Sequence, residues 1–295
     1  MTTPSVQHSQ RITQASASNL ALSFFHLSPE KQAAMNALYA FCRKVDDIAD
    51  EAQKPVDERR FQLENWRRQI QAVCLGEMPE KPHPIIVELA PWVAKYNLPQ
   101  EHFESLIQGM EMDLSIDRYD TWKALSEYCY RVASAVGLLS IEIFGYQHAS
   151  AHNYAYHLGQ ALQLTNILRD VRHDAELGRI YVPSELLERL SISDKAILSM
   201  TLSTEKLKEL VHAMVQEATN HYSKASQCLH REDRPSMVAA DLMGQIYWHL
   251  LQKISAYPEA LRSSKKIKLH KAYKGLLVLK SGLRHRCGWH APLYG

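Results

Sequence analysis

The chain has 295 residues, of which 46% are hydrophobic and 22% are charged, as in ordinary globular proteins. Its 11 Gly and 12 Pro are fewer than average usage would give, which favours long helices. The five cysteines show no paired spacing, so we expect reduced thiols in a cytoplasmic protein. No stretch approaches the length of about 18 uninterrupted apolar residues that a membrane span requires.

The net charge of +2 is unevenly distributed along the chain. The segment 262–295 contains nine Lys and Arg residues and no acidic residue, so the rest of the chain is net acidic. A basic tail of this kind is suited to contact with phosphate groups or with an anionic membrane surface. A solvated helix with a positive face explains it equally well. A nucleic-acid partner is not expected.

Taken in chain order, the sequence predicts helices almost throughout. Residues 1–15 lack an apolar core and are expected to be a flexible lead-in, followed by a single helical domain over 16–295. Ser28 and Pro29 predict a helix start, and Pro55 stops that helix after about residue 53. Helical periodicity predicts further helices at about 56–75, 83–96, 100–112, 121–145, 149–172, 203–229, 235–256 and 266–281.

Two of the predicted helices share the pattern Asp-x-x-x-Asp near their C-terminal ends. Each places a row of polar side chains on one helix face, because residues three or four positions apart lie above one another. Arg169 adjoins the second row. The two rows are Tyr39, Arg43, Asp46 and Asp50 in the first helix and Gln163, Asn166, Asp170 and Asp174 in the second.

Apolar residues flank both rows, so we expect the rows to face an apolar interior. A buried row of carboxylates is unfavourable unless it is paired or bound to metal, and carboxylate oxygens suit Mg²⁺. One such pattern alone is typical of a solvated face, but two copies favour a metal site. A di-iron centre is not supported, because the one Glu-x-x-His match, Glu80 to His83, lies between prolines.

The segments 37–50 and 161–174, which carry these rows, resemble the two signature segments of the squalene/phytoene synthase family. The shorter blocks 109–113, 128–137 and 178–183 are similar to further blocks of that family, and the similarity extends from about residue 16 to 260. The Gly-Met-Glu-Met-Asp block at 109–113 most resembles the branch that makes presqualene diphosphate for hopanoid synthesis in bacteria.

The resemblance implies an all-α bundle of the isoprenoid-synthase type around a central apolar cavity. It implies a magnesium-dependent prenyltransferase that joins two farnesyl diphosphates head to head into a cyclopropyl diphosphate, with release of diphosphate. NADPH is not expected to be needed for this step. Two to three Mg²⁺ ions would be held by Asp46, Asp50, Asn166, Asp170 and Asp174.

The resemblance also implies roles for individual residues. Val132, Ala133 and Leu164 would complete an apolar wall that excludes water. The rings of Tyr39, Tyr128 and Tyr247 would stabilise cationic carbon, although simple packing remains an alternative for each. The residues implied to be catalytic are Tyr39, Arg43, Asp46, Asp50, Tyr128, Asp170 and Asp174. Those implied to bind substrate are Ser18, Asn19, Tyr39, Arg43, Val136, Gly137, Gln163, Asn166, Arg169, Tyr181 and Tyr247.

Several alternatives stay open. A phytoene synthase would run the same chemistry on geranylgeranyl diphosphate, full squalene synthesis would need NADPH, and a non-catalytic assembly protein would be expected to lose signature aspartates that are intact here. His173 stands where many relatives carry a carboxylate, and Lys265, Lys266 and Lys268 stand where relatives place phosphate-binding arginines. Peripheral membrane contact through the tail and contact with downstream isoprenoid enzymes are both compatible with an oily product.

Overall fold

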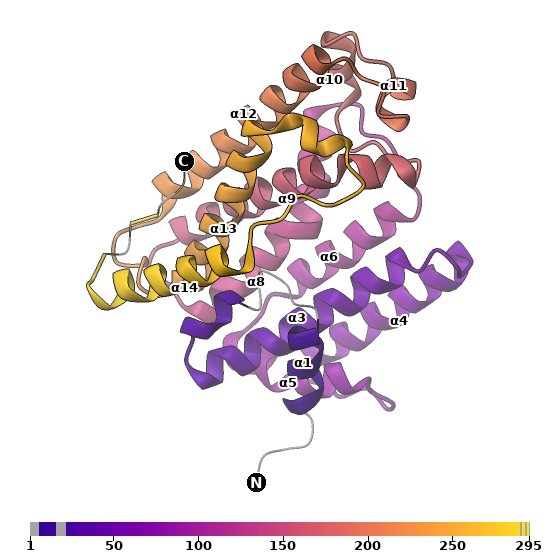
Figure 1. Ribbon diagram of the computed structural model, residues 1–295. Coiled ribbons are helices and arrows are strands. Elements are labelled where there is room, and N and C mark those ends of the chain that lie inside the picture. Colours follow the sequence, from indigo (N-terminus) through magenta and orange to yellow (C-terminus); the bar gives the residue numbers. More distant parts are fainter. Residues whose placement is uncertain (1–5, 16–21, 290, 293, 295) are drawn as a thin grey trace.

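A computed structural model describes residues 6–15, 22–289, 291–292 and 294 (Figure 1). These residues form helices and no strand, and the only β-type pairing among them is an isolated bridge between Arg118 and Ile180. The prediction of an all-α fold is therefore confirmed. The longer helices are α1 (Val6–Ala15), α3 (Pro29–Asp50), α4 (Val56–Cys74), α5 (Pro84–Tyr96), α6 (Gln100–Asp113), α7 (Trp122–Cys129), α8 (Ala135–Phe144), α9 (Ser150–Glu176), α12 (Thr204–Cys228), α13 (Val238–Ala256) and α14 (Lys271–Arg286). The short ones are η1 (Phe24–His26), a π-helical turn η2 (Tyr130–Ser134), α10 (Ser184–Arg189), α11 (Asp194–Leu198) and η3 (Pro258–Arg262).

Helix α3 begins where the sequence predicts. The Ser28 side chain accepts a hydrogen bond from the backbone N–H of Lys31, and Pro29 occupies the first helical turn; both features are typical of a helix N-terminus. Its inner face is fully buried, with Leu38, Phe41 and Val45 in the core. This burial fixes the rotation of α3, and the opposite face is left for polar residues.

Helix α9 lies at the centre of the molecule and packs against α12, α8 and α13 (Figure 1). The turn η2 also lies directly on it, because Gly159 has no side chain: a Cβ atom there would be 2.5 Å from the Cα atom of Ser134. The Ser134 hydroxyl donates to the backbone oxygen of Tyr156 over 2.8 Å. The close contact pins η2 and the start of α8 against α9.

The structure differs from the predicted helix over 121–145 in one respect. Instead of one regular helix, α7 and α8 are joined by η2, in which the N–H of Ala135 bonds to the oxygen of Tyr130, five residues earlier. Such wide turns insert one extra residue into a helix and occur often at functional sites. The helices α10 and α11 were not predicted, since neither is long enough to show a helical period.

Residues 6–15 also differ from expectation, because this part of the predicted flexible lead-in is the helix α1, which packs against α3 and α5. The backbone N–H of Ser9 donates to the buried carboxylate of Glu88 over 3.0 Å, and Ile12 packs against the core. A distant partner thus orders a segment that has little apolar character of its own.

The last helix, α14, runs over Lys271–Arg286 rather than 266–281. Its start is set by His270, whose side chain accepts a hydrogen bond from the N–H of Ala272. Among the described helices, none combines the length and the apolar character that crossing a lipid bilayer requires.

A histidine pair between α9 and α12 generates a prediction about acid stability. The Nδ1 atoms of His157 and His221 lie 3.0 Å apart. Burial, followed by the charges of His221 and Lys224, lowers the pKa of His157 to about 4 from 6.5. His157 therefore takes up a proton more readily in the unfolded chain than in the folded protein. The free energy of unfolding is highest above about pH 6.5, where His157 is neutral in both states, and it decreases as the pH falls toward 4.

We expect the melting temperature to fall over that pH range and His157→Gln to make the fall smaller. His212→Gln, at an exposed position of α12, is the matched control and should behave as the wild type. Thermal denaturation at several pH values measures both. An equal pH dependence in all three proteins would contradict the assignment.

Candidate active site

A cavity of about 420 Å³ lies between α3, α6, η2, α8, α9 and α13, within the range of about 300–1,000 Å³ usual for small-molecule pockets. Its lining changes along the helices. On α3 it runs from Met35 to Asp46, on α6 from Leu106 to Asp113, and on α9 from Tyr154 to Asn166. Each of these helices therefore turns from apolar to polar toward its C-terminal end, and the cavity has one polar end.

The first acidic row lies on α3 at this polar end. Arg43 donates to Asp46 over 3.0 Å and also pairs with Asp47 at 2.6 Å. Burial, followed by the charge of Asp50, raises the pKa of Asp46 to about 7, although Arg43 opposes the shift. The protein alone thus leaves the negative charge of Asp46 poorly compensated.

The second row lies on α9. Arg169 pairs with Asp170 at 2.5 Å, and Lys266 approaches the same carboxylate at 3.3 Å. Burial alone would raise the pKa of Asp170, but the hydrogen bond and charge of Arg169, with the charge of Lys266, hold it below its usual value. Within the described residues no cation forms an ion pair with Asp174. Burial, followed by the charge of Asp170, raises its pKa to about 7, although the charges of Lys266 and Arg179 oppose the shift.

The amide of Asn166 belongs to the same row and is incompletely bonded. Its nitrogen donates to the side-chain oxygen of Gln163 over 3.3 Å, whereas its oxygen Oδ1 is buried and has no hydrogen-bond partner among the residues that the structure describes. A buried acceptor without a partner costs free energy. It is therefore available to a ligand.

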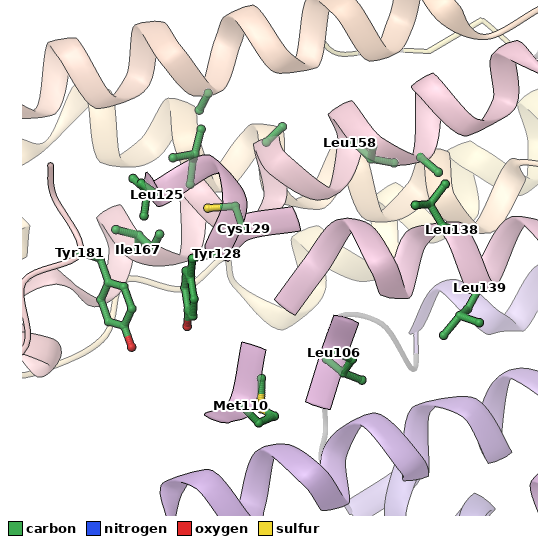
Figure 2. Close-up of a cluster of buried hydrophobic side chains, with 14 of the residues drawn as sticks. Leu106, Met110, Leu125, Tyr128, Cys129, Leu138, Leu139, Leu158, Ile167 and Tyr181 are labelled. Carbon is green, nitrogen blue, oxygen red and sulfur yellow. The ribbon is translucent and has the colours of Figure 1, made fainter. Parts of the chain in front are cut away.

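Asp113, at the end of α6, joins the two rows. Its carboxylate accepts hydrogen bonds from the hydroxyls of Tyr181 and Tyr128, over 2.8 and 3.1 Å, and Figure 2 shows these two hydroxyls pointing to the same side. Burial raises its pKa to about 6. Its charge acts on the pKa values of both Asp46 and Asp174. The rows on α3 and α9 thus face one region.

Gly178 directs the chain back toward this region after α9. Its φ of +78° suits glycine, and it lets the N–H of Arg179 bond to the oxygen of Asp174 over 2.8 Å. The N–H of Ile180 then donates to the oxygen of Asp117 over 2.9 Å. These two backbone hydrogen bonds hold residues 179–180 in place, so that the Tyr181 hydroxyl reaches Asp113.

The structure brings most of the predicted site residues together. Asp50, Arg169, Asp170, Asp174 and Tyr181 lie outside the cavity lining, although the charges of Asp50 and Asp174 reach Asp113. The predicted residues that line the cavity are Tyr39, Arg43, Asp46, Tyr128, Val132, Ala133, Val136, Gly137, Gln163, Asn166 and Tyr247.

Three predicted residues need separate comment. Ser18 and Asn19 lie outside the described residues. Leu164 was expected in the apolar wall, but it is buried in the core and does not line the cavity. Each residue rotates the helix by about 100°, so Leu162 and Leu164, on either side of Gln163, point in different directions. Leu162 lines the cavity, whereas Leu164 points into the core.

The residues flagged as departures also find places in the structure. His173 is exposed on α9. Lys265 and Lys266 lie beside it and beside Arg169 around a small surface hollow, so the basic tail does reach the second row. Lys268 is exposed, and its backbone oxygen accepts a hydrogen bond from Lys253.

Asp113 and Arg179 were not predicted as site residues. The guanidinium of Arg179 donates to the backbone oxygen of Asp113 over 3.1 Å. Asp113 ends the 109–113 block and could have been found there as the only Asp of that block. Arg179 could have been found in the same manner, as the only charged residue of the 178–183 block.

Comparison with known proteins agrees with this geometry. The chain matches the squalene/phytoene synthase family over residues 13–272, and it belongs to that family. The presqualene diphosphate synthase of Zymomonas mobilis is 39% identical over 250 residues, covering 83% of this chain and 84% of that protein. A phytoene synthase of Mycobacterium tuberculosis is 31% identical over 297 residues, covering 98% of this chain and 96% of that one. The predictions of the family and of an enzyme are confirmed.

A solved structure supports the fold assignment. The crystal structure of a dehydrosqualene synthase in complex with ligand superimposes with a TM-score of 0.82 at 25% identity, covering 96% of this chain and 97% of that one. The helical bundle described above is therefore the architecture of this family.

Asp113 generates the prediction for this site. In Asp113→Asn the new amide offers one acceptor oxygen, so one of the two tyrosine hydroxyls loses its partner and meets an N–H group. Such a bond to a charged group contributes about 1.5–3 kcal/mol, so we expect turnover to fall by about 10- to 100-fold with little change in melting temperature. Asp117→Asn, at an exposed position of the following loop, should leave turnover unchanged. Equal turnover in the two variants would refute a positioning role for Asp113.

Proposed function

We propose that this protein joins two farnesyl diphosphates head to head to form presqualene diphosphate and free diphosphate. The observation that carries the proposal is the cavity, which is apolar along most of its length and ends between the acidic rows of α3 and α9. The apolar part suits two prenyl chains and the polar end suits their diphosphates. The greater identity to a presqualene diphosphate synthase than to a phytoene synthase, 39% against 31%, favours farnesyl diphosphate over the longer substrate.

The donor atoms at the polar end fit Mg²⁺. The oxygen Oδ1 of Asn166 is buried, with no hydrogen-bond partner in the described part of the chain, and the raised pKa values of Asp46 and Asp174 indicate carboxylates short of positive charge. In the described residues the aspartates form no compact group of the kind that would cage an ion by itself, which suits ions that also bind substrate phosphates. We propose that two to three Mg²⁺ ions are held by Asp46, Asp50, Asn166, Asp170 and Asp174, where they would neutralise the departing diphosphate.

The basic side chains nearby would bind and orient the diphosphates. Arg43 and Arg169 each pair with an aspartate of their own row, and Lys266 comes from the tail. Guanidinium groups bind phosphate oxygens with two parallel hydrogen bonds. These cations therefore stand where the leaving group would be released.

The reaction then proceeds in the apolar part of the cavity. The bond from C1 to the diphosphate oxygen of one substrate breaks, and the 2,3-double bond of the other supplies the electrons for a new carbon–carbon bond. A proton is lost as the cyclopropane closes. The rings of Tyr39, Tyr128 and Tyr247 line the cavity and would stabilise the positive carbon by about 0.5–2 kcal/mol each. The hydrogen bond to Asp113 holds the ring of Tyr128 in place.

Water must be kept from the cationic carbon, because it would trap it as an alcohol. Val132, Val136 and Leu162 form the wall of the cavity, and they would exclude water once the chains are bound. Formation of the cyclopropyl diphosphate is not a reduction, so we propose that NADPH is not required.

We further propose that the partners are small prenyl diphosphates and not nucleic acids, and that the protein works in the cytoplasm. Because the product carries a long hydrocarbon chain, contact with downstream isoprenoid enzymes and peripheral contact with a membrane are both compatible with this function.

The proposal is tested by product analysis. Purified protein is incubated with Mg²⁺ and either farnesyl or geranylgeranyl diphosphate, with and without NADPH, and the products are separated by chromatography and identified by mass. We expect presqualene diphosphate from the farnesyl substrate, no reduction when NADPH is added, and loss of product when Mg²⁺ is chelated. A product from geranylgeranyl diphosphate alone would mark a phytoene synthase, and no product from either would favour the non-catalytic assembly protein.

The second acidic row is tested by Asp174→Asn. Removing one charged oxygen from an ion site weakens charge stabilisation by several kcal/mol, so we expect turnover to fall by at least about 100-fold. Glu176→Gln makes the same kind of change two residues further along α9, where the carboxylate pairs with Arg172 on the surface. This control should retain turnover. Full turnover in Asp174→Asn would remove the row from the mechanism.

A further inference from the structure

The last helix, α14, has two unlike faces. On one face Leu277 is buried against Leu242 and Ile246 of α13. On the other, Leu276, Leu279 and Leu283 form a stripe at helical spacing, with 57%, 61% and 54% of their surfaces exposed. Single exposed leucines are common on protein surfaces. Three in line on one helix form an apolar patch of the kind that marks an interaction site.

Aromatic residues extend this patch. Trp289 follows α14, where its N–H bonds to the backbone oxygen of Arg284, and it is 71% exposed. Phe25 of η1 is 79% exposed, and its neighbour His26 ties η1 to α14 by a 3.2 Å contact with the backbone oxygen of Val278. Exposed apolar side chains from two distant parts of the chain are thus held on neighbouring elements. We call Phe25, Leu276, Leu279, Leu283 and Trp289 the apolar patch.

The segment that carries most of the patch has charges of one sign. The segment 262–295 contains nine Lys and Arg residues and no acid, and the exposed cations Lys271, Lys280 and Arg286 lie on α14 itself. Lys280 and Arg286 adjoin the stripe on opposite sides, since each lies about 60° from its centre on the helix circumference. A second copy of this face is a poor partner, because cations would meet cations. A partner with an apolar interior and negatively charged groups at its surface would match both the apolar patch and the cations beside it.

We infer that α14, with Phe25 and Trp289, docks the protein on an anionic lipid bilayer. Leucine and tryptophan on one side of a helix, flanked by Lys and Arg, are typical of helices that lie in the membrane interface. Each basic residue near an anionic bilayer contributes about 1 kcal/mol, and the leucines add burial in the acyl region. The patch enters the bilayer surface while the rest of the bundle remains outside it.

The docking surface lies next to the proposed active site. Helix α13 lines the cavity with Met243 and Tyr247 and packs on α14 with Leu242 and Ile246. Ser23, which also lines the cavity, is two residues from Phe25. The link between the docking surface and the product rests on the proposed function. An oily product formed in the cavity would then lie one helix away from the lipid that receives it.

The inference is tested by flotation of the full-length protein with vesicles, in the absence of any prenyl substrate. We expect binding to vesicles of phosphatidylcholine and phosphatidylglycerol in equal parts, weakening with added salt, and much less binding to phosphatidylcholine alone. Lys280→Gln/Arg286→Gln should lower binding to the anionic vesicles by at least about tenfold. Leu279→Ser/Leu283→Ser should abolish it.

Phe61→Ser/Leu75→Ser is the matched control, since these two side chains are equally exposed on and beside α4, and it should bind as the wild type. Melting temperatures verify that each variant folds. Failure of the wild type to bind anionic vesicles, or equal binding by the leucine variant, would overturn the inference. The inference would also be overturned if light scattering showed the wild type to be a dimer and Leu279→Ser/Leu283→Ser to be a monomer. Turnover of farnesyl diphosphate in detergent solution is measured separately, so a failure of the proposed function would remain visible on its own.

Discussion

The structure depends on a concentration of negative charge that the protein does not neutralise by itself. Three helices bring carboxylates to one region near their C-terminal ends, α3 with Asp46, α6 with Asp113 and α9 with Asp174. A helix C-terminus carries negative partial charge, so the ends add to the carboxylates. Burial is the main cause that raises the pKa of each carboxyl, to about 7, 6 and 7, and neighbouring aspartates add to the shift. The proposed Mg²⁺ ions would relieve this cost.

The same three helices also build the apolar part of the cavity. Each presents small or hydrophobic side chains on the N-terminal side of its acidic end, as Met35 does on α3 and Leu158 on α9. The separation of the polar and apolar parts therefore follows from the sequence of each helix. A substrate with a charged head and a hydrocarbon tail fits only one way round.

The bounds of helix α3 and the acidic rows could largely be predicted from the sequence, because they depend on residues close together in the chain. The helix start at Ser28 and Pro29 and the end near Pro55 are local features, and the predicted start agrees with α3. The acidic rows required only the spacing of residues along one helix.

What was missed depends on contacts between distant residues. Helix α1 is ordered by Glu88, 79 residues from Ser9. Asp113 acquires its place in the site from Tyr181, 68 residues later. Leu164 was placed in the wall by resemblance alone, but the burial of its helix face turns it into the core. No local pattern in the sequence contains these contacts.

The π-helical turn η2 has a consequence for how this helix can change in length. Tyr128 precedes the turn and Val136 follows it, and both line the cavity. Shortening the chain by one residue between 130 and 134 would restore regular winding and rotate one of them by about 100° relative to the other. A homologous helix with one residue fewer between 130 and 134 would therefore need different side chains in the cavity wall, either before or after the deletion.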